Sequence, residues 1–400
     1  MLFCDVIFFT LNLSYLLLTL NLKQMVIGIL KESGAERRVA MLPGEVAILV
    51  KLGVTVNVEK GAGIKAWVSD SEYISAGASV AERNDLIPGS AFILSVNPPS
   101  EDDLLTFTGG QILCCVVNPA ENREWLEKAR VRGLTVLALD IIPRTTRAQS
   151  MDILSSMATV SGYKAVLAAA SVLPGFFPMF MSAAGTIKPS KVLILGAGVA
   201  GLQALAIARK LGAVVEVFDV RSAVKEEVKS LGGRFIEVEG AKEDSSAGGY
   251  AVEQTEEFRL KQQELIQKHA IASDVVIATA QIPGKKAPVL IRKETVLAMK
   301  PGSVIVDLAA CSGGNCELTE NDKTVVVNGI SIIGKSDFPS DMPSDSSKMF
   351  GSNIVNLLKL MIGKGGEFSF NLQDDIIFGT TAVHKGEYIS ERAKQLIGLK

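Results

Sequence analysis

Residues 191–220 read KVLILGAGVAGLQALAIARKLGAVVEVFDV and decide the fold of the chain around them. An apolar run precedes the pattern G-x-G-x-x-G at Gly196, Gly198 and Gly201, and a helical pattern follows it. In such a pattern the first glycine permits a tight turn, the second lets the backbone approach a pyrophosphate, and the third allows close packing of helix on strand. The context predicts a dinucleotide-binding Rossmann unit, with the pyrophosphate at the helix N-terminus. A glycine-rich turn without a ligand is the alternative.

The end of the next strand indicates which dinucleotide binds. Asp219 stands where a carboxylate accepts hydrogen bonds from the ribose diol and repels a 2′-phosphate, so NAD(H) is predicted over NADP(H). Arg221 would contact a 2′-phosphate or remain solvated. Val199 and Val220, which neighbour these positions, are included among the predicted cofactor contacts.

Two further segments are predicted to lie near the cofactor. Residues 240–253 are polar, glycine-rich and longer than most strand-to-helix connections, which is typical of a lid or of plain surface. Within them, Tyr250 is expected to close over a bound ring. Ile282, Pro283 and Gly284 follow an apolar strand pattern and are expected at the carboxyl edge of the sheet, where dinucleotides lie.

The composition excludes several classes of protein. The chain has 41 basic and 43 acidic residues, which argues against binding nucleic acid through a basic face. Its five cysteines have neither a disulfide framework nor a metal-site spacing, which indicates reduced thiols. Histidine, the usual general acid or base near neutral pH, occurs only at His269 and His384.

Strand and helix patterns alternate from Met25 onward and predict βαβ units. We expect an α/β protein of two Rossmann-like doubly wound domains separated by a cleft. The first is discontinuous, with residues 25–155 and 346–400, and residues 160–343 form the NAD-binding domain. Residues 1–24 are apolar and expected outside the fold, as an extension or a misplaced start, with a membrane anchor as the alternative.

Residues 143–152 read PRTTRAQSMD and gather polar side chains just before a long helical pattern. Ser, Thr and Asp at such a place commonly cap the helix that follows. On the residues alone, helix capping and ligand binding are equally open interpretations.

The whole set of motifs resembles a known family. The resemblance is to the NAD(H)-binding components of proton-translocating NAD(P) transhydrogenases, within the alanine dehydrogenase/transhydrogenase family. It is carried by the stretches KESGAERRVAMLPG, PRTTRAQSMDILSSMATVSGYKAV, GAGVAGLQALAIARKLGAVVEVFDVR, GGYAVE, IPGKKAPVLI and VIVDLAACSGGNCELT. The PRTTRAQSMD and GGYA segments are specific to transhydrogenases, whereas much of the rest is shared with alanine dehydrogenases.

The resemblance implies that the PRTTRAQSMD segment reaches across the interdomain cleft to the nicotinamide end of NAD(H). Arg144 and Asp152 would fix the carboxamide and ribose, and Gln149 would reach the partner's nucleotide. Ser155 lies one helical turn beyond Asp152 and completes the implied catalytic group. NADH would pass hydride directly to NADP+ on a partner component, which requires positioning and exclusion of water rather than an acid or base.

The same resemblance implies partners and a location. Hydride transfer would be coupled to proton movement across a membrane, so an NADP(H)-binding component and a membrane proton-channel component are expected. Two copies of this chain would form a homodimer. The protein would lie peripherally on the cytoplasmic face of a bacterial inner membrane or on the matrix side of an organelle membrane.

Two alternatives remain open on the residues. An alanine dehydrogenase-like oxidoreductase must protonate or deprotonate its substrate, and such enzymes carry a lysine and a histidine in the first domain. This chain has Asn97 where the lysine is expected, and no histidine before His269. A catalytically silent NAD-binding module is the second alternative.

The chain also departs from the transhydrogenase pattern. Cys311 and Ser312 stand in a segment that usually reads A-A-E-x-G-G, and Gln281 replaces an apolar residue. Asp341 stands where a basic residue is common. These departures bear on activity rather than on the fold.

Overall fold

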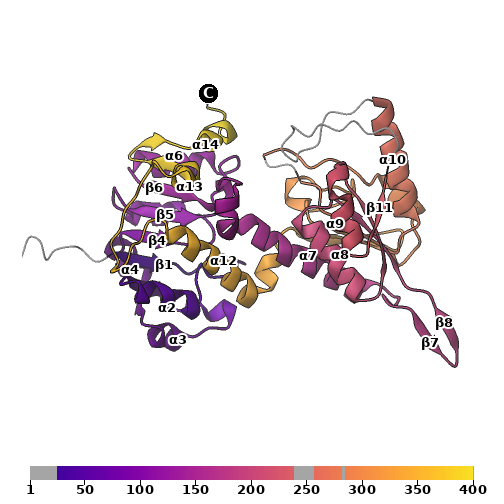
Figure 1. Cartoon of the computed structure of the whole chain (residues 1–400), viewed down its shortest axis with the longest axis horizontal. Coiled ribbons are helices and arrows are strands. Elements are labelled where there is room, and N and C mark those ends of the chain that lie inside the picture. The colour runs from indigo at the N-terminus through magenta and orange to yellow at the C-terminus, as the bar shows by residue number, and fades with distance from the viewer. Residues whose placement is uncertain (1–24, 238–255, 282–283, 400) are drawn as a thin grey trace, which may run out of the picture. The chain divides into compact units, whose positions relative to one another are not determined.

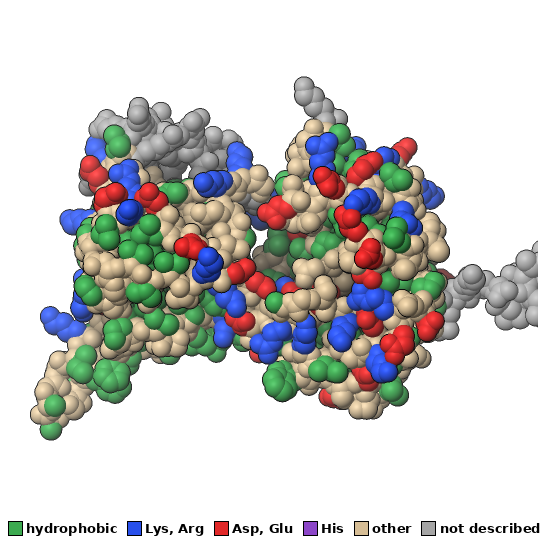
Figure 2. Space-filling model, turned by 180° about the vertical axis from the view of Figure 1, so that it is seen from behind, with side chains coloured by type: hydrophobic (Ala, Val, Ile, Leu, Met, Phe, Trp, Pro, Cys, Tyr) green, Lys and Arg blue, Asp and Glu red, His purple; other side chains and the backbone are tan. Residues whose placement is uncertain are grey.

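The computed structural model describes residues 25–237, 256–281 and 284–399, which divide into two compact units (Figure 1). The first unit combines the described residues up to Asp152 with those from Phe350 onward, and the second is Ile153–Met349. Each unit is built around its own sheet. On the face drawn in Figure 2, acidic and basic side chains are interspersed over each unit.

Within the described residues, the first unit holds an eight-stranded sheet in the order β17-β16-β6-β5-β4-β1-β2-β3. The strands are β1 (Val26–Ile29), β2 (Thr55–Glu59), β3 (Ser79–Ala81), β4 (Phe92–Leu94), β5 (Ile112–Cys115), β6 (Thr135–Ala138), β16 (Thr381–His384) and β17 (Glu387–Tyr388). Strands β1 to β6 pair in parallel, and the C-terminal β16 joins β6 antiparallel. The discontinuous first domain predicted from the sequence is therefore confirmed.

Helices surround this sheet, whose central strands are apolar and buried on both faces, as in other parallel sheets. The α-helices are α2 (Pro43–Lys51), α3 (Asp70–Ser75), α4 (Arg83–Gly89), α5 (Glu101–Thr106), α6 (Arg123–Val131), α13 (Asp375–Thr380) and α14 (Glu391–Leu396). Short 3-10 turns add η1 (Ile64–Ala66), η2 (Leu139–Ile141) and η3 (Thr146–Met151).

The described residues of the second unit form a seven-stranded sheet in the order β11-β10-β9-β12-β13-β15-β14. Its strands are β9 (Lys191–Leu195), β10 (Val214–Phe218), β11 (Arg234–Ile236), β12 (Val275–Ala278), β13 (Val304–Asp307), β14 (Lys323–Val327) and β15 (Ile330–Gly334). All pairs are parallel except β14 with β15. The chain runs outward from β9 in both directions, which is the predicted doubly wound topology and puts the switch point between β9 and β12.

The helices of the second unit include a long apolar one at its start. They are α7 (Ile153–Val172), α8 (Val199–Lys210), α9 (Lys225–Ser230), α10 (Glu256–Ile271), α11 (Lys293–Ala298) and α12 (Pro343–Leu358), with 3-10 turns η4 (Ser222–Val224), η5 (Ala310–Ser312) and η6 (Phe338–Asp341). Helix α12 contains the boundary between the units. Among the described residues, α7 alone is long and apolar enough to cross a membrane. Its residues Ala165, Val166 and Ala169 lie in the hydrophobic core of the second unit.

A hairpin interrupts the alternation of strands and helices in the second unit. It pairs β7 (Phe180–Ser182) with β8 (Gly185–Ile187) and projects from the unit (Figure 1). The sequence indicated only a break in the pattern here. Every residue of both strands is exposed, including the apolar Met181 and Ile187, and the ring of Phe180 packs against Phe176 with centroids 4.4 Å apart.

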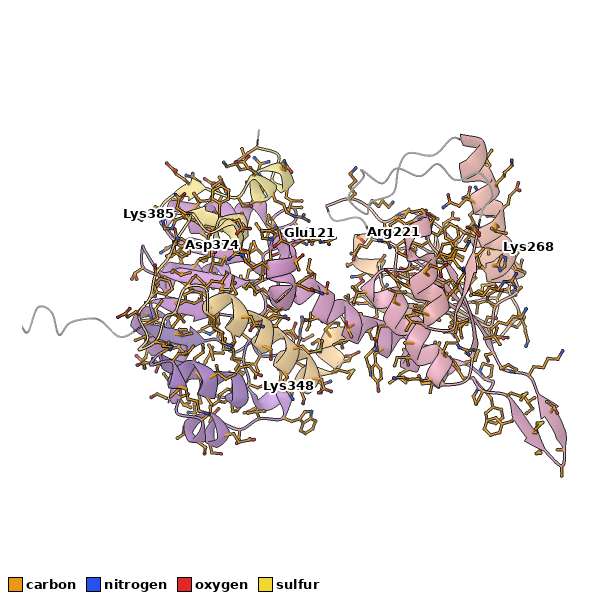
Figure 3. The ribbon with its side chains drawn as sticks, in the orientation of Figure 1. Glu121, Arg221, Lys268, Lys348, Asp374 and Lys385 are labelled. Carbon is orange, nitrogen blue, oxygen red and sulfur yellow. The ribbon has the colours of Figure 1, made fainter. Side chains whose placement is uncertain are left out.

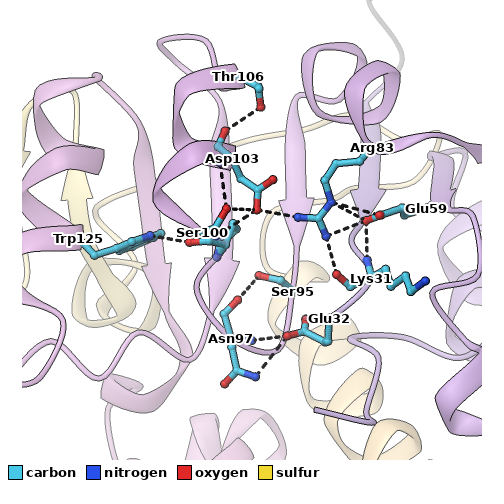
Figure 4. A network of polar contacts seen from close by, with 11 residues as sticks. Lys31, Glu32, Glu59, Arg83, Ser95, Asn97, Ser100, Asp103, Thr106 and Trp125 are labelled. Atoms are coloured by element: carbon cyan, nitrogen blue, oxygen red, sulfur yellow. Dashed lines mark hydrogen bonds and ion pairs between the residues drawn. The ribbon is translucent and has the colours of Figure 1, made fainter. Parts of the chain in front are cut away.

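A polar network ties the carboxyl ends of the first unit's strands together (Figure 4). Arg83 Nε donates to both oxygens of Glu59, at 3.1 Å each, and its Nη1 donates to Asp103 at 2.7 Å. Its Nη2 donates to the carbonyl of Lys31 at 2.6 Å. Asp103 also forms the capping box of α5 with Ser100. One guanidinium thus joins the ends of β1 and β2 to the first turn of α5.

Candidate functional site

The predicted nucleotide turn joins β9 to α8 at the carboxyl edge of the second sheet. Gly196 has φ = 104°, a backbone conformation that favours glycine, and its amide donates to Phe218 O at 2.8 Å. Thr279, just after β12, donates its hydroxyl to the carbonyls of Leu195 and Gly196 at 3.2 Å each. The turn is therefore held from both neighbouring strands, at the switch point where ligands of such sheets bind.

Two glycines let the first turn of α8 lie close to its neighbours. A Cβ at Gly201 would lie 1.8 Å from the carbonyl oxygen of Gly196, and one at Gly162 of α7 would lie 2.1 Å from the carbonyl oxygen of Ala200. At Gly198 a Cβ would meet nothing within 4 Å, and Gly198 and Val199 are exposed. The backbone at the start of α8 is therefore open to an anion, which the N-terminus of a helix favours.

Asp219 follows β10 and contacts the same turn. Its Oδ2 accepts a hydrogen bond from the Ala197 amide at 2.7 Å. Burial opposes its ionisation, but the hydrogen bonds from Arg221 and Ala197 outweigh this and hold the pKa of the carboxyl below its usual value. Asp219 is thus a fixed negative charge beside the glycine-rich turn. Arg221, which Figure 3 labels, forms an ion pair with Asp219 at 2.9 Å and is therefore not simply solvated.

Asp307 and Asn315 support this edge of the sheet and were missed from the sequence. The fully buried Asp307 ends β13 and accepts from the amides of Asn315 and Cys316 at 2.7 and 2.9 Å. Asn315 in turn exchanges hydrogen bonds with the backbone of Ala280, accepting at 3.0 Å and donating at 2.8 Å. Ala280 directly follows Thr279, so this chain of contacts leads to the nucleotide turn. An acidic residue ending an apolar strand was the available signal.

The PRTTRAQSMD segment forms η3 and its flanks. Thr145 caps η3, the 3-10 turn within the segment, by accepting from the Ala148 amide, and does not cap the long helix α7 that follows. Arg147, which the sequence did not single out, forms ion pairs with Asp374, at 2.8 Å, and with Asp375 (Figure 3 labels Asp374). These contacts anchor the segment to α13 and the residue before it.

The predicted clamp residues fall on both sides of the division between the units. Arg144, Gln149 and Asp152 are in the first unit, and Ser155 is in α7 of the second. Arg144 and Gln149 are exposed, whereas Asp152 and Ser155 are partly buried. The amide of Asp152 donates to the Gln149 carbonyl at 3.4 Å, which closes η3.

Three predicted cofactor contacts, Tyr250, Ile282 and Pro283, lie outside the described residues. Among the departures from the family pattern, Gln281 and Ser312 contact each other, with the Gln281 amide donating to the Ser312 hydroxyl at 3.2 Å. Their side chains therefore make one polar contact at the ends of β12 and β13. Asp341 pairs with Lys335 at 2.7 Å, so its negative charge is compensated within the unit.

Asn97, at the position where a lysine would be expected in an alanine dehydrogenase, contacts two carboxylates, and Figure 4 shows its contact with Glu32. Its amide nitrogen donates to Glu32 at 3.3 Å and to Glu36 at 3.2 Å, and Arg38 pairs with Glu36 at 2.6 Å. Burial raises the pKa of Glu32 to about 7, even though the amides of Val96 and Asn97 lower it. Burial also opposes ionisation of Glu36, but Arg38 brings its pKa to about 2. This network therefore holds one charged carboxylate and one that titrates near neutral pH.

Comparison with known proteins identifies the family. Residues 28–161 match the N-terminal domain described as alanine dehydrogenase/PNT, and residues 165–391 match the C-terminal domain of the same description. The chain belongs to the alanine dehydrogenase/PNT family. The family predicted from the sequence is thus confirmed, and alanine dehydrogenase/PNT domains imply that the chain binds NAD.

Within the alanine dehydrogenase/PNT family, similar relatives are transhydrogenase subunits. The chain is 44% identical over 368 residues to NAD(P) transhydrogenase subunit alpha of Haemophilus influenzae, covering 91% of this chain and 72% of that protein. In Rhodospirillum rubrum, a polypeptide named as the first part of NAD(P) transhydrogenase subunit alpha is 44% identical over 363 residues, covering 88% and 94%. A transhydrogenase crystal structure from Sinorhizobium meliloti matches with a TM-score of 0.84 and 39% identity, covering 91% and 100%.

Replacing two glycines around the nucleotide turn should distinguish a glycine needed for packing, and hence for stability, from one needed for NADH binding. Gly162→Ala should lower the free energy of unfolding by about 1–3 kcal/mol, because its Cβ would overlap the Ala200 carbonyl. Gly198→Ala should leave stability unchanged but weaken NADH binding, because its Cβ would occupy space open to the pyrophosphate. Calorimetry and NADH fluorescence titration measure the two effects. Normal NADH binding by Gly198→Ala would contradict the assignment of this turn.

Glu32 should make the first unit less stable as pH rises. A carboxyl whose pKa rises from its ordinary 4.5 to about 7 on folding stabilises the fold below pH 4.5 and loses that contribution as pH rises through 7. When the pH rises from about 5 to about 8, the free energy of unfolding of the wild-type chain should therefore fall by about 2–3 kcal/mol relative to that of Glu32→Gln. Urea unfolding followed by tryptophan fluorescence measures this, because Trp67 and Trp125 both lie in the first unit.

Glu36→Gln is the matched control for the Glu32 experiment. The pKa of Glu36 is lowered to about 2, so its contribution is present above pH 4.5 and is lost only as pH falls toward 2. Its replacement should lower stability by similar amounts at both pH values. Parallel pH profiles for the wild-type chain and Glu32→Gln would show that Glu32 does not titrate in this range.

Proposed function

We propose that this chain is the NAD(H)-binding subunit of a proton-translocating NAD(P) transhydrogenase. It passes hydride between NADH and NADP+ held on a partner component. The observation that carries the proposal is the open, glycine-lined turn before α8 in a chain 44% identical to transhydrogenase alpha subunits. The enzyme class is therefore an NAD(P) transhydrogenase component, active only together with its partners.

The residues fit a bound NAD(H). The exposed backbone at Gly198 and Val199 approaches the pyrophosphate, and the start of α8 supplies the positive end of a helix dipole. Asp219 lies on the neighbouring strand end, where the adenosine ribose of a Rossmann-bound dinucleotide sits, and it favours NADH over NADPH. Bound NAD(H) supplies the hydride, and the chain supplies orientation and a dry environment.

The clamp role proposed for Arg144, Gln149, Asp152 and Ser155 follows from the chemistry of hydride transfer. Two nicotinamide rings must be held face to face, because the reaction rate depends on their separation and alignment. Arg144 and Asp152 orient the carboxamide and ribose of NAD(H), and Gln149 approaches the partner's nucleotide. The exposure of Arg144 and Gln149 supports this role, since both side chains must reach a ligand.

An alanine dehydrogenase activity is less well supported. Both histidines of the chain have side-chain partners: His269 pairs with Glu216 at 2.6 Å, and His384 of the first unit contacts Thr135 at 2.9 Å. Asn97 takes the position of the expected lysine and donates to two carboxylates. An amide cannot accept or deliver the proton that oxidation of an amino acid requires.

The partners proposed are an NADP(H)-binding component and a membrane proton-channel component. The name of the Rhodospirillum rubrum relative describes a subunit alpha divided between polypeptides, which supports an assembly of several subunits. Within it, two copies of this chain form a homodimer. The assembly lies at the cytoplasmic face of a bacterial inner membrane or at the matrix side of an organelle membrane.

Reconstitution tests the function. The chain would be mixed with the purified NADP(H)-binding component of a related transhydrogenase, and transfer from NADH to an NADP+ analogue of distinct absorbance would be followed. Transfer that needs both proteins is the expected result. Binding of NADH without transfer would favour a silent module, and NAD-dependent oxidation of alanine by the chain alone would favour the dehydrogenase.

In the same assay, Arg144→Ala and Asp152→Ala should separate orientation from binding. Each should slow hydride transfer by about tenfold or more, because small misplacement of reacting groups is costly, while weakening NADH binding much less. Arg123→Ala, an exposed arginine on α6, is the control expected to change neither quantity. Unchanged transfer by the correctly folded Arg144 and Asp152 variants would rule out the clamp.

A further inference from the structure

The Arg221 side chain binds both oxygens of Asp219, the carboxylate that is expected to recognise the adenosine ribose. Its Nε donates to Asp219 Oδ1 at 2.9 Å, and its Nη2 donates to Oδ2 at 2.9 Å. The Arg221 backbone amide adds a hydrogen bond to Oδ1 at 2.8 Å, and the Ala197 amide adds one to Oδ2 at 2.7 Å. This is the two-pronged geometry in which arginine binds carboxylates most strongly.

The consequence is that Asp219 has no acceptor position to spare. A carboxylate offers about four lone-pair positions, and the donors from Arg221 and Ala197 fill them. Both hydroxyls of a ribose diol would need acceptors at the same oxygens. The ribose and the Arg221 guanidinium therefore compete for Asp219.

The two side chains differ in their ability to move. The Asp219 side chain is only 6% exposed and is fixed to the nucleotide turn through Ala197. The Arg221 side chain is 32% exposed and follows the end of β10 on a flexible stem. When a ligand arrives, the guanidinium is the partner that can leave. A guanidinium binds phosphate with the same forked geometry as carboxylate.

We propose that Arg221 is a specificity-determining residue. It reduces the difference between the binding affinities of the site for NAD(H) and for NADP(H). With an unphosphorylated ribose, Arg221 competes for Asp219 and weakens binding. With a 2′-phosphate, the guanidinium transfers from Asp219 to the phosphate and compensates its charge, so NADP(H) is tolerated. This inference rests on the proposed NAD(H) site and adds a second ligand class, the 2′-phosphorylated dinucleotides, to that site.

Nearby charges support the assignment to Arg221. Lys225, on the first turn of α9, pairs with Glu237 at 2.6 Å. Arg234, on β11, pairs with Glu216 of β10 at 3.2 Å and is 76% exposed. Both cations thus have carboxylate partners other than Asp219, whereas Arg221 is joined to the residue that faces the predicted ribose.

The test is a pair of fluorescence titrations of the full chain with NADH and with NADPH. Arg221→Met keeps much of the side-chain length but removes the guanidinium. It should tighten NADH binding and weaken NADPH binding, so that the ratio of the two dissociation constants grows by about five- to tenfold, as expected for loss of a forked charge-assisted contact. Arg234→Met removes a different ion pair of β10 and should leave that ratio unchanged.

Opposite shifts for the two nucleotides distinguish specificity from a general loss of structure, which would weaken both. Weaker NADH binding by Arg221→Met, or an unchanged ratio, would overturn the role of Arg221 while leaving the NAD(H) site intact. Absence of NADH binding to the unaltered chain would instead overturn the proposed function, and this inference with it. Arg221→Lys, which keeps the charge without the fork, should retain more NADPH binding than Arg221→Met.

Discussion

The position of the candidate site depends on how closely the first turn of α8 approaches its neighbours. The backbone at Gly201 lies against the Gly196 carbonyl, and the backbone at Gly162 of α7 lies against the Ala200 carbonyl. Any side chain at either glycine would push α8 away from β9 or from α7. The open backbone at Gly198 exists because the helix is held on both sides of it.

Buried polar groups extend this constraint across the sheet edge. At the end of β13, Asp307 accepts hydrogen bonds from the backbone amides of Asn315 and Cys316. The Asn315 side chain in turn donates to the carbonyl of Ala280, which follows β12. Thr279 then binds the carbonyls of the turn after β9. These contacts link the ends of three strands, so the backbone of the nucleotide turn cannot shift independently of its neighbours.

The sequence was sufficient for the fold because its signals are local. Alternating apolar strand runs and helical patterns, with the glycine pattern, predicted the doubly wound sheet, and the comparisons confirmed the family. Pairings such as Arg221 with Asp219, Arg147 with Asp374, and Asn97 with Glu32 could not be predicted in this way. They depend on which side chains tertiary packing brings together, and the partner of a charged residue cannot be inferred from its place in the sequence. The exposed β7–β8 hairpin carries no strong periodic signal either.

The discontinuous first unit has a consequence for biosynthesis. Strand β6 obtains its outer neighbour only from β16, which begins at Thr381, after the whole second unit has been made. The contiguous second unit can therefore complete its sheet on the ribosome while the earlier unit still has an open strand edge. Domains usually finish in the order in which they emerge. Here the later-made sheet can be completed first, and the apolar edge of β6 must be kept from pairing with other nascent strands until β16 has emerged.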